Sequence, residues 1–317
     1  MNIKKIAVGM DFSPESDIAT RHAINIARHV GAEVVLVHVG AILEQPLHVS
    51  EAMHPSIKKW EQFVHQELAE DRRRLDDMRE RLHGQGVEIS HLVRDGFADT
   101  GLAETASEIG ADLLVVGTHG RSGLKRFFLG SISERVVRLS DTNVMVARPS
   151  DHDHGGYRRI LVATDFSAPA ARALELALHL AARDARVELV HFWQVPVTAA
   201  TPYAPFRAAE DALATLREAL AEAAELNGQN LLERYRDRGV ELTYRAVQAP
   251  PAHGINEQLA QGGYDLVAVG SHGRRGIRRF LLGSVAELTV RHAPCSVLVA
   301  HGGPENQNDA GSATPAE

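Results

Sequence analysis

Two glycine-rich stretches of this chain have the spacing of an anion-binding loop. Each has two glycines separated by two residues, then nine residues, then a Gly-Ser pair. Glycine lets a backbone turn sharply and lets its N–H groups approach an anion without a Cβ in the way. The Gly-Ser pair opens a predicted helix, whose unpaired N–H groups and dipole attract phosphate. The stretches contain Gly117, Gly120, Gly130 and Ser131 in the first half, and Gly270, Gly273, Gly283 and Ser284 in the second.

The serine of each Gly-Ser pair has a second explanation as a helix cap. Ser131 with Glu134, and Ser284 with Glu287, have the spacing of a capping box. Capping requires neither of the upstream glycines, however, and it is compatible with phosphate binding.

Two other nucleotide motifs are missing from the sequence, because it has no G-x-x-x-x-G-K-[ST] and no G-x-G-x-x-G after a strand.

An aspartate follows the first predicted strand of each half, Asp11 in one and Asp165 in the other. Such a carboxylate could act as a general base or bind hydroxyl groups. We favour hydroxyl binding, because no second carboxylate or nucleophile recurs beside the aspartates in both halves. His119 and His272 lie inside the glycine stretches and could titrate near neutral pH. We favour packing or hydrogen bonding for them, and therefore assign no catalytic residue.

The basic side chains near the glycine stretches have two interpretations, phosphate contact and solvated surface. Arg121 and Arg274 are the better candidates for phosphate contact, because each immediately follows its loop. The stretch from Asp151 to His154 is interpreted as a polar linker rather than a metal site. The remaining histidines have no ligand spacing such as H-E-x-x-H, so no metal ligand is assigned.

The glycine stretches recur because the whole chain is an internal repeat. The offset between equivalent positions is 154 residues from Asp11 to Asp165 and 153 residues from Gly117 to Gly270. A period this long predicts duplicated domains rather than the stacked units of a solenoid. We predict one domain over residues 1–149, a second over residues 157–301 and a disordered tail over residues 302–317.

Hydrophobic patterning predicts that each half alternates strands with helices. Such alternation indicates parallel βαβ units, and nearly continuous apolar strands fit a sheet covered on both faces. Ligands of such sheets bind at the carboxyl ends of the strands, where Asp11 and Gly117 lie. In the first half the pattern predicts strands over 3–9, 33–39, 87–93, 113–117 and 143–147, and helices over 14–30, 57–83, 99–109 and 131–139.

Composition excludes several classes of protein. The chain has 317 residues, a formal charge of −7 and one cysteine, Cys295. An acidic chain gains no counterion release on DNA, so nucleic acid is not an expected partner. A single cysteine excludes an intrachain disulfide and a Cys-rich metal site. No apolar run approaches the roughly 18 residues of a membrane span, and no signal-peptide core is evident, so we expect a cytoplasmic protein without membrane contact.

Together these features resemble the ATP-binding subgroup of the universal stress protein family. The resemblance rests on the run from Val8 to Ser13, on Val37-His38-Val39 and on the G-x2-G-x9-G-S spacing in both halves. It implies an α/β fold of two tandem doubly wound domains, each a five-stranded parallel sheet in the order 3-2-1-4-5 with helices on both faces. In this family the final strand pairs with another copy, so we expect an intrachain pseudo-dimer, with a homodimer as a further possibility.

The resemblance also implies ATP with Mg²⁺ in each half. Asp11 and Asp165 would meet the ribose or adenosine end, and Val39 and Phe192 would pack near adenine. The residues around the phosphates would be Gly117, Gly120, Arg121, Gly130 and Ser131 in the first half, and Gly270, Gly273, Arg274, Gly283 and Ser284 in the second. The neighbours expected to border the nucleotide are Gly9, Met10, Val116 and Ile132 in the first half, and Ala163, Thr164, Val269 and Val285 in the second.

The halves differ where the third strand meets its helix. Gly96 of the first half corresponds to Ala249, which Pro250 and Pro251 follow. If the glycine needs a positive φ beside adenine, the second half is expected to be distorted there and to bind ATP more weakly.

The expected function is an ATP-binding sensor or regulator of the stress response. Two alternatives stay open, a slow ATPase or self-phosphorylating enzyme, and a dimer-building module that binds nucleotide incidentally.

Overall fold

Local sequence signals set both ends of the first helix. The computed structural model describes residues 2–40, 55–118, 130–149, 156–195, 206–236, 238–273 and 282–301. Helix α1 (Pro14–Val30) begins after Ser13, whose side chain accepts a hydrogen bond from the backbone N–H of Ser16. Gly31 ends the helix in the left-handed conformation, with φ of 75°, and thereby confirms the predicted stop.

The two halves repeat one series of elements, as the sequence predicts. In the second half, α5 (Ala168–Leu180) passes directly into a long strand, without a left-handed glycine. The other elements of the first half are β1 (Lys5–Gly9), β2 (Glu33–Gly40), α2 (Pro55–Arg81), β3 (Ile89–Asp95), α3 (Ala98–Glu108), β4 (Leu113–Val116), α4 (Ser131–Leu139) and β5 (Asn143–Val146). Those of the second half are β6 (Tyr157–Ala163), β7 (Ala181–Trp193), α6 (Phe206–Tyr235), β8 (Glu241–Gln248), α7 (Pro251–Gly262), β9 (Leu266–Gly270), α8 (Ser284–His292) and β10 (Ser296–Ala300).

All the strands belong to one ten-stranded sheet in the order β3-β2-β1-β4-β5-β10-β9-β6-β7-β8. Within each half the strands are parallel and follow the expected order 3-2-1-4-5. The halves join where β5 and β10 pair antiparallel, with Met145 opposite Leu298. The expected pairing of the two final strands is therefore present within one chain.

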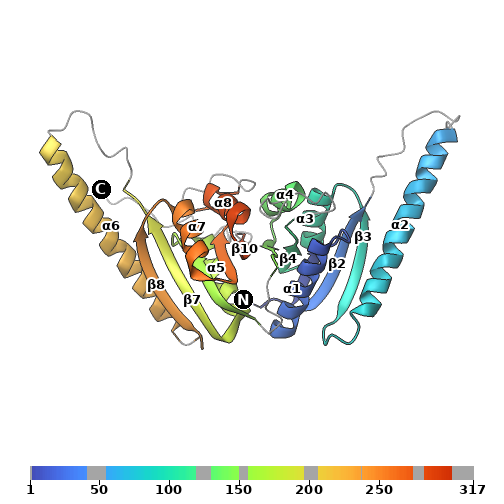
Figure 1. Ribbon diagram of the computed structural model, residues 1–317, viewed down its shortest axis with the longest axis horizontal. Coiled ribbons are helices and arrows are strands. Elements are labelled where there is room, and N and C mark those ends of the chain that lie inside the picture. The colour runs from blue at the N-terminus through green and yellow to red at the C-terminus, as the bar shows by residue number, and fades with distance from the viewer. Residues whose placement is uncertain are drawn as a thin grey trace, which may run out of the picture.

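Helices cover both faces of the sheet, so each half is doubly wound. Apolar side chains of α1, α2, α5 and α6 pack on one face, and those of α3, α4, α7 and α8 pack on the other. Figure 1 shows α2 and α6 along the outer strands of the two halves, with α4 and α8 near the middle. The near-continuous burial of strands such as β4 and β5 follows from this double cover.

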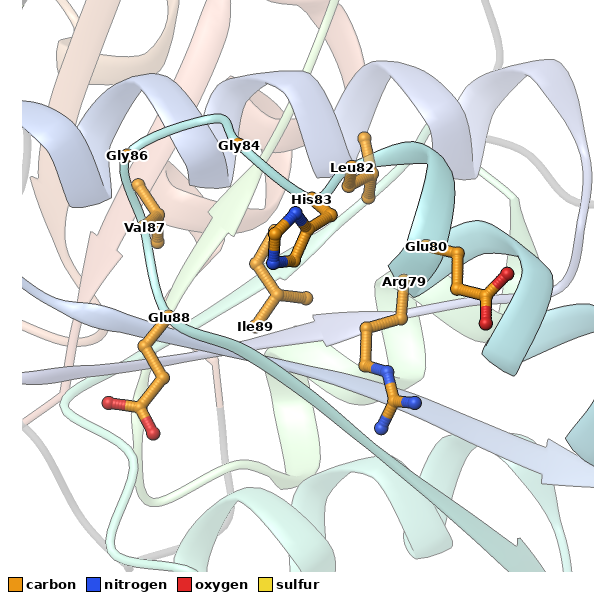
Figure 2. Close-up of a pocket in the computed structure, with 9 residues that line it drawn as sticks. All are labelled: Arg79, Glu80, Leu82, His83, Gly84, Gly86, Val87, Glu88 and Ile89. Carbon is orange, nitrogen blue, oxygen red and sulfur yellow. The ribbon is translucent and has the colours of Figure 1, made fainter.

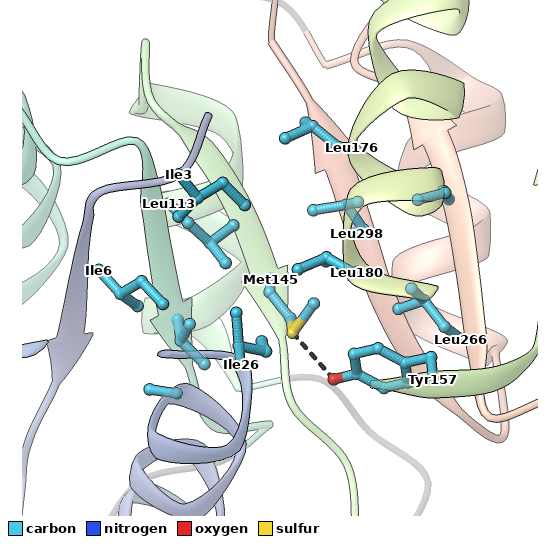
Figure 3. Packing of buried hydrophobic residues seen from close by; sticks show 14 of the residues in the cluster. Ile3, Ile6, Ile26, Leu113, Met145, Tyr157, Leu176, Leu180, Leu266 and Leu298 are labelled. Carbon is cyan, nitrogen blue, oxygen red and sulfur yellow. Dashed lines mark hydrogen bonds between the residues drawn. The ribbon is translucent and has the colours of Figure 1, made fainter. Parts of the chain in front are cut away.

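The core is continuous across the boundary between the halves. Figure 3 shows Met145 of β5 close to Leu180 and Leu298 of the second half. The hydroxyl of Tyr157 donates a hydrogen bond to the sulfur of Met145 over 3.2 Å. Cys295 is buried beside the same boundary, and burial raises the pKa of its thiol to about 12. A thiol that stays protonated agrees with the packing role of a small apolar residue.

The predicted linker and tail lie outside the described residues, so the proposed domain limits of 149 and 157 stay predictions. Among the helices that the structure describes, none has the length and apolar character needed to cross a membrane.

Candidate functional site

In the first half, most of the predicted site residues meet at the carboxyl edge of the sheet. They line a small cavity of about 70 Å³ between the ends of β1, β2 and β4 and the start of α4. This volume is far below the roughly 300–1,000 Å³ of small-molecule pockets, so a nucleotide would extend beyond the cavity along the sheet edge. The predicted residues that line it are Gly9, Met10, Asp11, Val39, Val116, Gly117 and Ile132.

A strained turn carries the aspartate in both halves. Oδ1 of Asp11 accepts hydrogen bonds from the backbone N–H of Ser13, at 3.1 Å, and from the hydroxyl of Ser13, at 2.5 Å. Oδ1 of Asp165 likewise accepts from the N–H of Ser167, at 3.0 Å. Phe12 and Phe166, which follow the aspartates, are the residues other than glycine with positive φ in the described chain, at 61° and 62°. This conformation costs roughly 1–2 kcal/mol in an L-residue, so its presence in both halves marks a turn whose shape is held by its surroundings.

A histidine of the second strand holds that turn in each half. Nδ1 of His38 lies 2.6 Å from the carbonyl oxygen of Met10, and Nδ1 of His191 lies 2.7 Å from that of Thr164. The same rings pack against the strained phenylalanines, with centroids 4.9 Å and 4.7 Å apart. Each aspartate is therefore placed by the neighbouring strand as well as by its own turn.

The first glycine of each loop is required by packing. A Cβ on Gly117 would lie 2.7 Å from the carbonyl oxygen of Glu15, and one on Gly270 would lie 2.9 Å from the backbone nitrogen of Ala170. No real side chain tolerates such contacts with backbone atoms, so these glycines let the end of the fourth strand lie against the first helix. Close packing thus accounts for both positions, in addition to the access to an anion that the sequence suggests.

The two ends of each loop are hydrogen-bonded to each other. The N–H of Gly130 donates to the carbonyl oxygen of Thr118 over 2.6 Å, and the N–H of Gly283 donates to that of Ser271 over 2.7 Å. These bonds place the start of the helix beside the end of the strand. The hydroxyl of Ser133 adds a bond of 2.7 Å to the carbonyl oxygen of Gly117.

The capping-box interpretation of Ser131 and Ser284 is wrong. The N-caps are Gly130 and Gly283, both extended at φ near −65°, and the serines are the first helical residues. The carbonyl oxygen of Gly130 accepts from the N–H of Glu134, which fixes the helix start one residue before the serine. Because glycine has no side chain to cap the helix, the first-turn N–H groups of α4 and α8 receive no side-chain cap.

In the second half, the structure describes more of the loop. A Cβ on Gly273 would lie 2.6 Å from Oδ2 of Asp165, so this glycine lies directly against the carboxylate. The hydroxyl of Ser271 lies 2.9 Å from Nδ1 of His272, which agrees with a hydrogen-bonding role for that histidine. Thr164 is buried and its Oγ1 accepts from the N–H of Phe166. Val269 is buried, and Ala163 and Val285 are partly buried and pack against the same apolar cluster.

Several predicted residues cannot be placed. His119, Gly120 and Arg121 of the first loop and Arg274 of the second lie outside the described residues, as do the other basic residues of both loops.

Sequence reasoning missed four residues that line the cavity, Ser16, Ala98, Leu102 and Ser133. It also missed Gly101 of α3, where a Cβ would lie 2.9 Å from Val39, and its counterpart Gly254, where a Cβ would lie 2.4 Å from Phe192. The signal was present in the sequence, because these two glycines recur at the offset of 153. They provide the space that the side chains of Val39 and Phe192 occupy.

The turn after the third strand differs between the halves as the sequence suggests. Gly96 has φ of 139°, which confirms that this position uses a conformation that other residues rarely adopt. Ala249 has no positive φ, yet α7 begins at Pro251, the counterpart of Ala98 at the start of α3. The N–H of Gly254 donates to Pro250 as that of Gly101 donates to Phe97. The expected distortion therefore does not extend into the helix.

A larger hollow lies at the opposite edge of the first half. It is formed by the end of α2 and the start of β3 and includes Arg79, Glu80, His83 and Glu88. Figure 2 shows its charged side chains spread around the rim rather than converging on one point. Opposite charges without a common centre do not define a ligand, so we place the candidate site at the carboxyl edge. The described residues include no group of three or more His, Cys, Asp or Glu that could hold a metal ion.

Fold and site together define a tandem, doubly wound α/β protein with a glycine-capped helix beside an aspartate turn in each half. The model of the universal stress protein family matches residues 2–148 and 156–301. The chain therefore belongs to the universal stress protein family.

Similar proteins match either the whole chain or one half of it. "Universal stress protein Rv2623" of Mycobacterium tuberculosis is 29% identical over 304 residues, which cover 93% of this chain and 95% of that protein. "Universal stress protein MJ0577" of Methanocaldococcus jannaschii is 26% identical over 154 residues, 46% of this chain and 94% of that protein. The crystal structure of a universal stress protein from Archaeoglobus fulgidus superposes with a TM-score of 0.65 at 18% identity, and covers 95% of this chain and 97% of that one. This last likeness concerns the fold alone.

Proposed function

We propose that each half binds one adenine nucleotide, ATP with Mg²⁺, and that the protein is a regulator or sensor of the stress response. One observation carries the proposal. In both halves an aspartate turn, a glycine at the end of the fourth strand and a helix start capped by glycine belong to the same sheet edge. Such a helix start attracts phosphate, and a carboxylate on a neighbouring strand suits ribose hydroxyls.

We propose one direction for the nucleotide in each half. The phosphates would lie over the first turns of α4 and α8, and the base would lie toward Val39 in the first half and Phe192 in the second. Mg²⁺ keeps several water ligands and commonly binds through phosphates and one or two carboxylates. A site with a single aspartate fits an ion that arrives with the triphosphate.

Regulation is favoured over catalysis because the aspartate is engaged in shaping its own turn. Its Oδ1 accepts a hydrogen bond from the N–H of the N-cap residue of the following helix, Ser13 or Ser167, in both halves. Positioning of phosphates without an activated nucleophile gives limited hydrolysis. The expected homodimer and the cytoplasmic location stay predictions.

The first test is mass analysis of the small molecules released by denaturing freshly purified protein, where we expect ATP or ADP. The second is calorimetry on a double variant, Gly120→Val with Gly273→Val. A side chain at Gly273 would push against Asp165, and Gly120 is its counterpart at the offset of 153. We expect ATP binding to be lost while the circular dichroism spectrum is retained.

A matched control is the pair Ser90→Val and Thr243→Val. These residues are counterparts at the same offset and are exposed on β3 and β8. The control should bind ATP like the parent. If the glycine variant binds ATP as tightly as the parent, the proposed phosphate site is wrong.

A further inference from the structure

His38 lies between the nucleotide-site turn and the outer helix of the first half. Its Nδ1 faces the carbonyl oxygen of Met10 at 2.6 Å, and its Nε2 faces Oδ2 of Asp71 on α2 at 3.1 Å. Both His38 and Asp71 are largely buried, with side chains 6% and 13% exposed. A continuous path of hydrogen bonds thus runs from α2 through His38 to the residue that precedes Asp11.

The same helix also contacts the strained residue of that turn. The guanidinium of Arg74 lies 4.1 Å from the centre of the Phe12 ring, and its Nη1 lies 3.7 Å from Oδ1 of Asp71. The Phe12 ring also packs against the His38 ring, with the ring centroids 4.9 Å apart. Residues of α2 therefore support both the carbonyl before Asp11 and the side chain after it.

Both partners of the His38 ring are hydrogen-bond acceptors only. A backbone carbonyl and an ionised carboxylate can each accept a hydrogen bond but cannot donate one. The ring satisfies both partners at once only when both of its nitrogens carry a proton. Replacement of Asp71 therefore removes one link of the path and leaves the link to Met10.

The second half keeps the histidine and replaces the residues of the helix. His191 and Phe166 repeat the contacts of His38 and Phe12, but the offset of 153 places Ala224 where Asp71 stands. The helix is held there by Tyr244, whose hydroxyl donates to the carbonyl oxygen of Ala224 over 2.6 Å. The tyrosine ring fills the space beside Gly228, where a Cβ would lie 2.0 Å from it.

We propose that Asp71, acting through His38, is a positioning residue that sets the nucleotide affinity of the first half. This inference rests on the proposed function. The carboxylate holds the His38 ring by a hydrogen bond, and His38 holds the turn so that Asp11 faces the nucleotide. The charged side chains that line a hollow together with Phe12 are Asp17 of α1 and Arg74, Asp77, Glu80 and Arg81 of α2.

The experiment compares Asp71→Ala with the parent in the full chain. Both carry Gly273→Val, which removes ATP binding by the second half and leaves the first half to be measured. Calorimetry gives the dissociation constant for Mg·ATP, and Asp71→Asn is the conservative variant, whose side-chain amide keeps a hydrogen-bonding group beside His38. Glu70→Ala is the matched control, because Glu70 is the preceding residue of the same helix and its side chain is 58% exposed.

We expect Asp71→Ala to weaken ATP binding by roughly three- to tenfold, because it removes the hydrogen bond that links α2 to His38. Asp71→Asn should restore most of the affinity, since its amide can still hydrogen-bond to the ring. His38→Asn should keep the bond to Met10 and lose the link to Asp71, and should therefore match Asp71→Ala in affinity.

Each outcome has one meaning. If the Gly273→Val parent binds no ATP, the proposed function fails. If it binds ATP and Asp71→Ala has the same affinity, this inference is overturned while the function stands. If Asp71→Asn binds ATP as weakly as Asp71→Ala, or if Glu70→Ala weakens binding to the same extent, the hydrogen bond to His38 does not set the affinity and the inference is likewise overturned.

Discussion

Arg291 of α8 donates hydrogen bonds to Glu134 of α4 across the boundary between the two halves. The distances are 2.6 Å from Nη2 to Oε1 and 3.3 Å from Nε to Oε2. The repeat produces the reciprocal pair, Arg138 with Glu287, at 3.6 Å. Because α4 and α8 begin at the two proposed phosphate sites, these four side chains connect the helices that the two nucleotides would contact.

Replacement of Arg291 by alanine should lower the free energy of unfolding more than replacement of Arg138. Arg291 lies within 3.0 Å of both Glu134 and Glu287, whereas the two contacts of Arg138 are 3.5 Å and 3.6 Å long. Both arginines are about 40% exposed, 42% and 39%, so solvent screens the pairs and we expect about 1 kcal/mol or less. Urea unfolding at low and at high salt provides the measurement. An equal loss for both variants, unaffected by salt, would contradict this ranking.

Much of the fold could be predicted because its signals are local and repeated. The ends of α1 are set by Ser13 and Gly31, and an offset of 154 residues at the start and 153 thereafter relates the elements of the first half to those of the second. The start of β3 was expected at Val87 and lies at Ile89, because Gly86 has a left-handed conformation and the following residues complete the turn. Edges of strands depend on such turns more than on apolar runs.

The site could be predicted less completely, because its shape depends on contacts between distant residues. The sequence pointed to Asp11, Gly117 and Gly130, but it gave Ser131 a capping role that Gly130 has in the structure. The sequence offered no reason for Gly117 other than anion binding. The close approach of the Glu15 backbone to Gly117 joins residues that are 102 positions apart (117 minus 15), so it could not be foreseen from local patterns. The positive φ of Phe12 follows from tertiary contacts with His38 and could not be deduced from residue type.

The protein should lose stability in mild acid because of His301. Its backbone N–H donates to Oδ1 of Asn143 over 3.2 Å, and its Nε2 is buried without a hydrogen-bond partner among the described residues. Burial, followed by the nearby charges of His272 and Arg172, lowers the pKa of His301 to about 4. The unfolded chain, with an ordinary histidine pKa of about 6.5, binds the proton first. The stabilisation is therefore complete above about pH 6.5 and is lost as pH falls toward 4.

A shift of this size corresponds to a loss of about 3 kcal/mol across that interval. His301→Gln should show a smaller decrease of unfolding free energy between these pH values, measured by urea unfolding. His253→Gln, at an exposed position of α7 where the side chain is 76% exposed, is the control and should behave like the parent. Identical pH profiles for His301→Gln and the parent would mean that the ring is solvated in the folded state.

ATP turnover should be far slower than the roughly 1–100 s⁻¹ of dedicated kinases. Asp11 and Asp165 accept hydrogen bonds within their own turns, and the sequence has no second carboxylate or nucleophile that recurs beside them in both halves. A steady-state phosphate-release assay with saturating Mg·ATP measures the rate. A rate inside the kinase range that disappears in the double variant Asp11→Ala, Asp165→Ala would identify the protein as an enzyme.

The second half should bind ATP more weakly than the first, and the main reason is Phe192. Val39 lines the cavity of the first half, whereas the larger ring of Phe192 occupies the counterpart position and is 6% exposed. A Cβ on Gly254 would lie 2.4 Å from that ring, compared with 2.9 Å between Gly101 and Val39, so the ring fills its space more tightly. A base that displaces the ring must disturb this packing. We expect about a tenfold higher dissociation constant, which corresponds to about 1.4 kcal/mol.

Exchange of the two side chains tests this explanation in the full chain. With Gly120→Val to block the first half, Phe192→Val should tighten ATP binding by the second half. With Gly273→Val to block the second half, Val39→Phe should weaken binding by the first. Calorimetry measures each affinity, and far-UV circular dichroism checks that the fold is kept.

The opposite result has a physical basis as well, because stacking of a base on an aromatic ring stabilises complexes by about 1–3 kcal/mol. Weaker binding by Phe192→Val would therefore indicate that the ring stacks on adenine, and would contradict this explanation for a weaker second site.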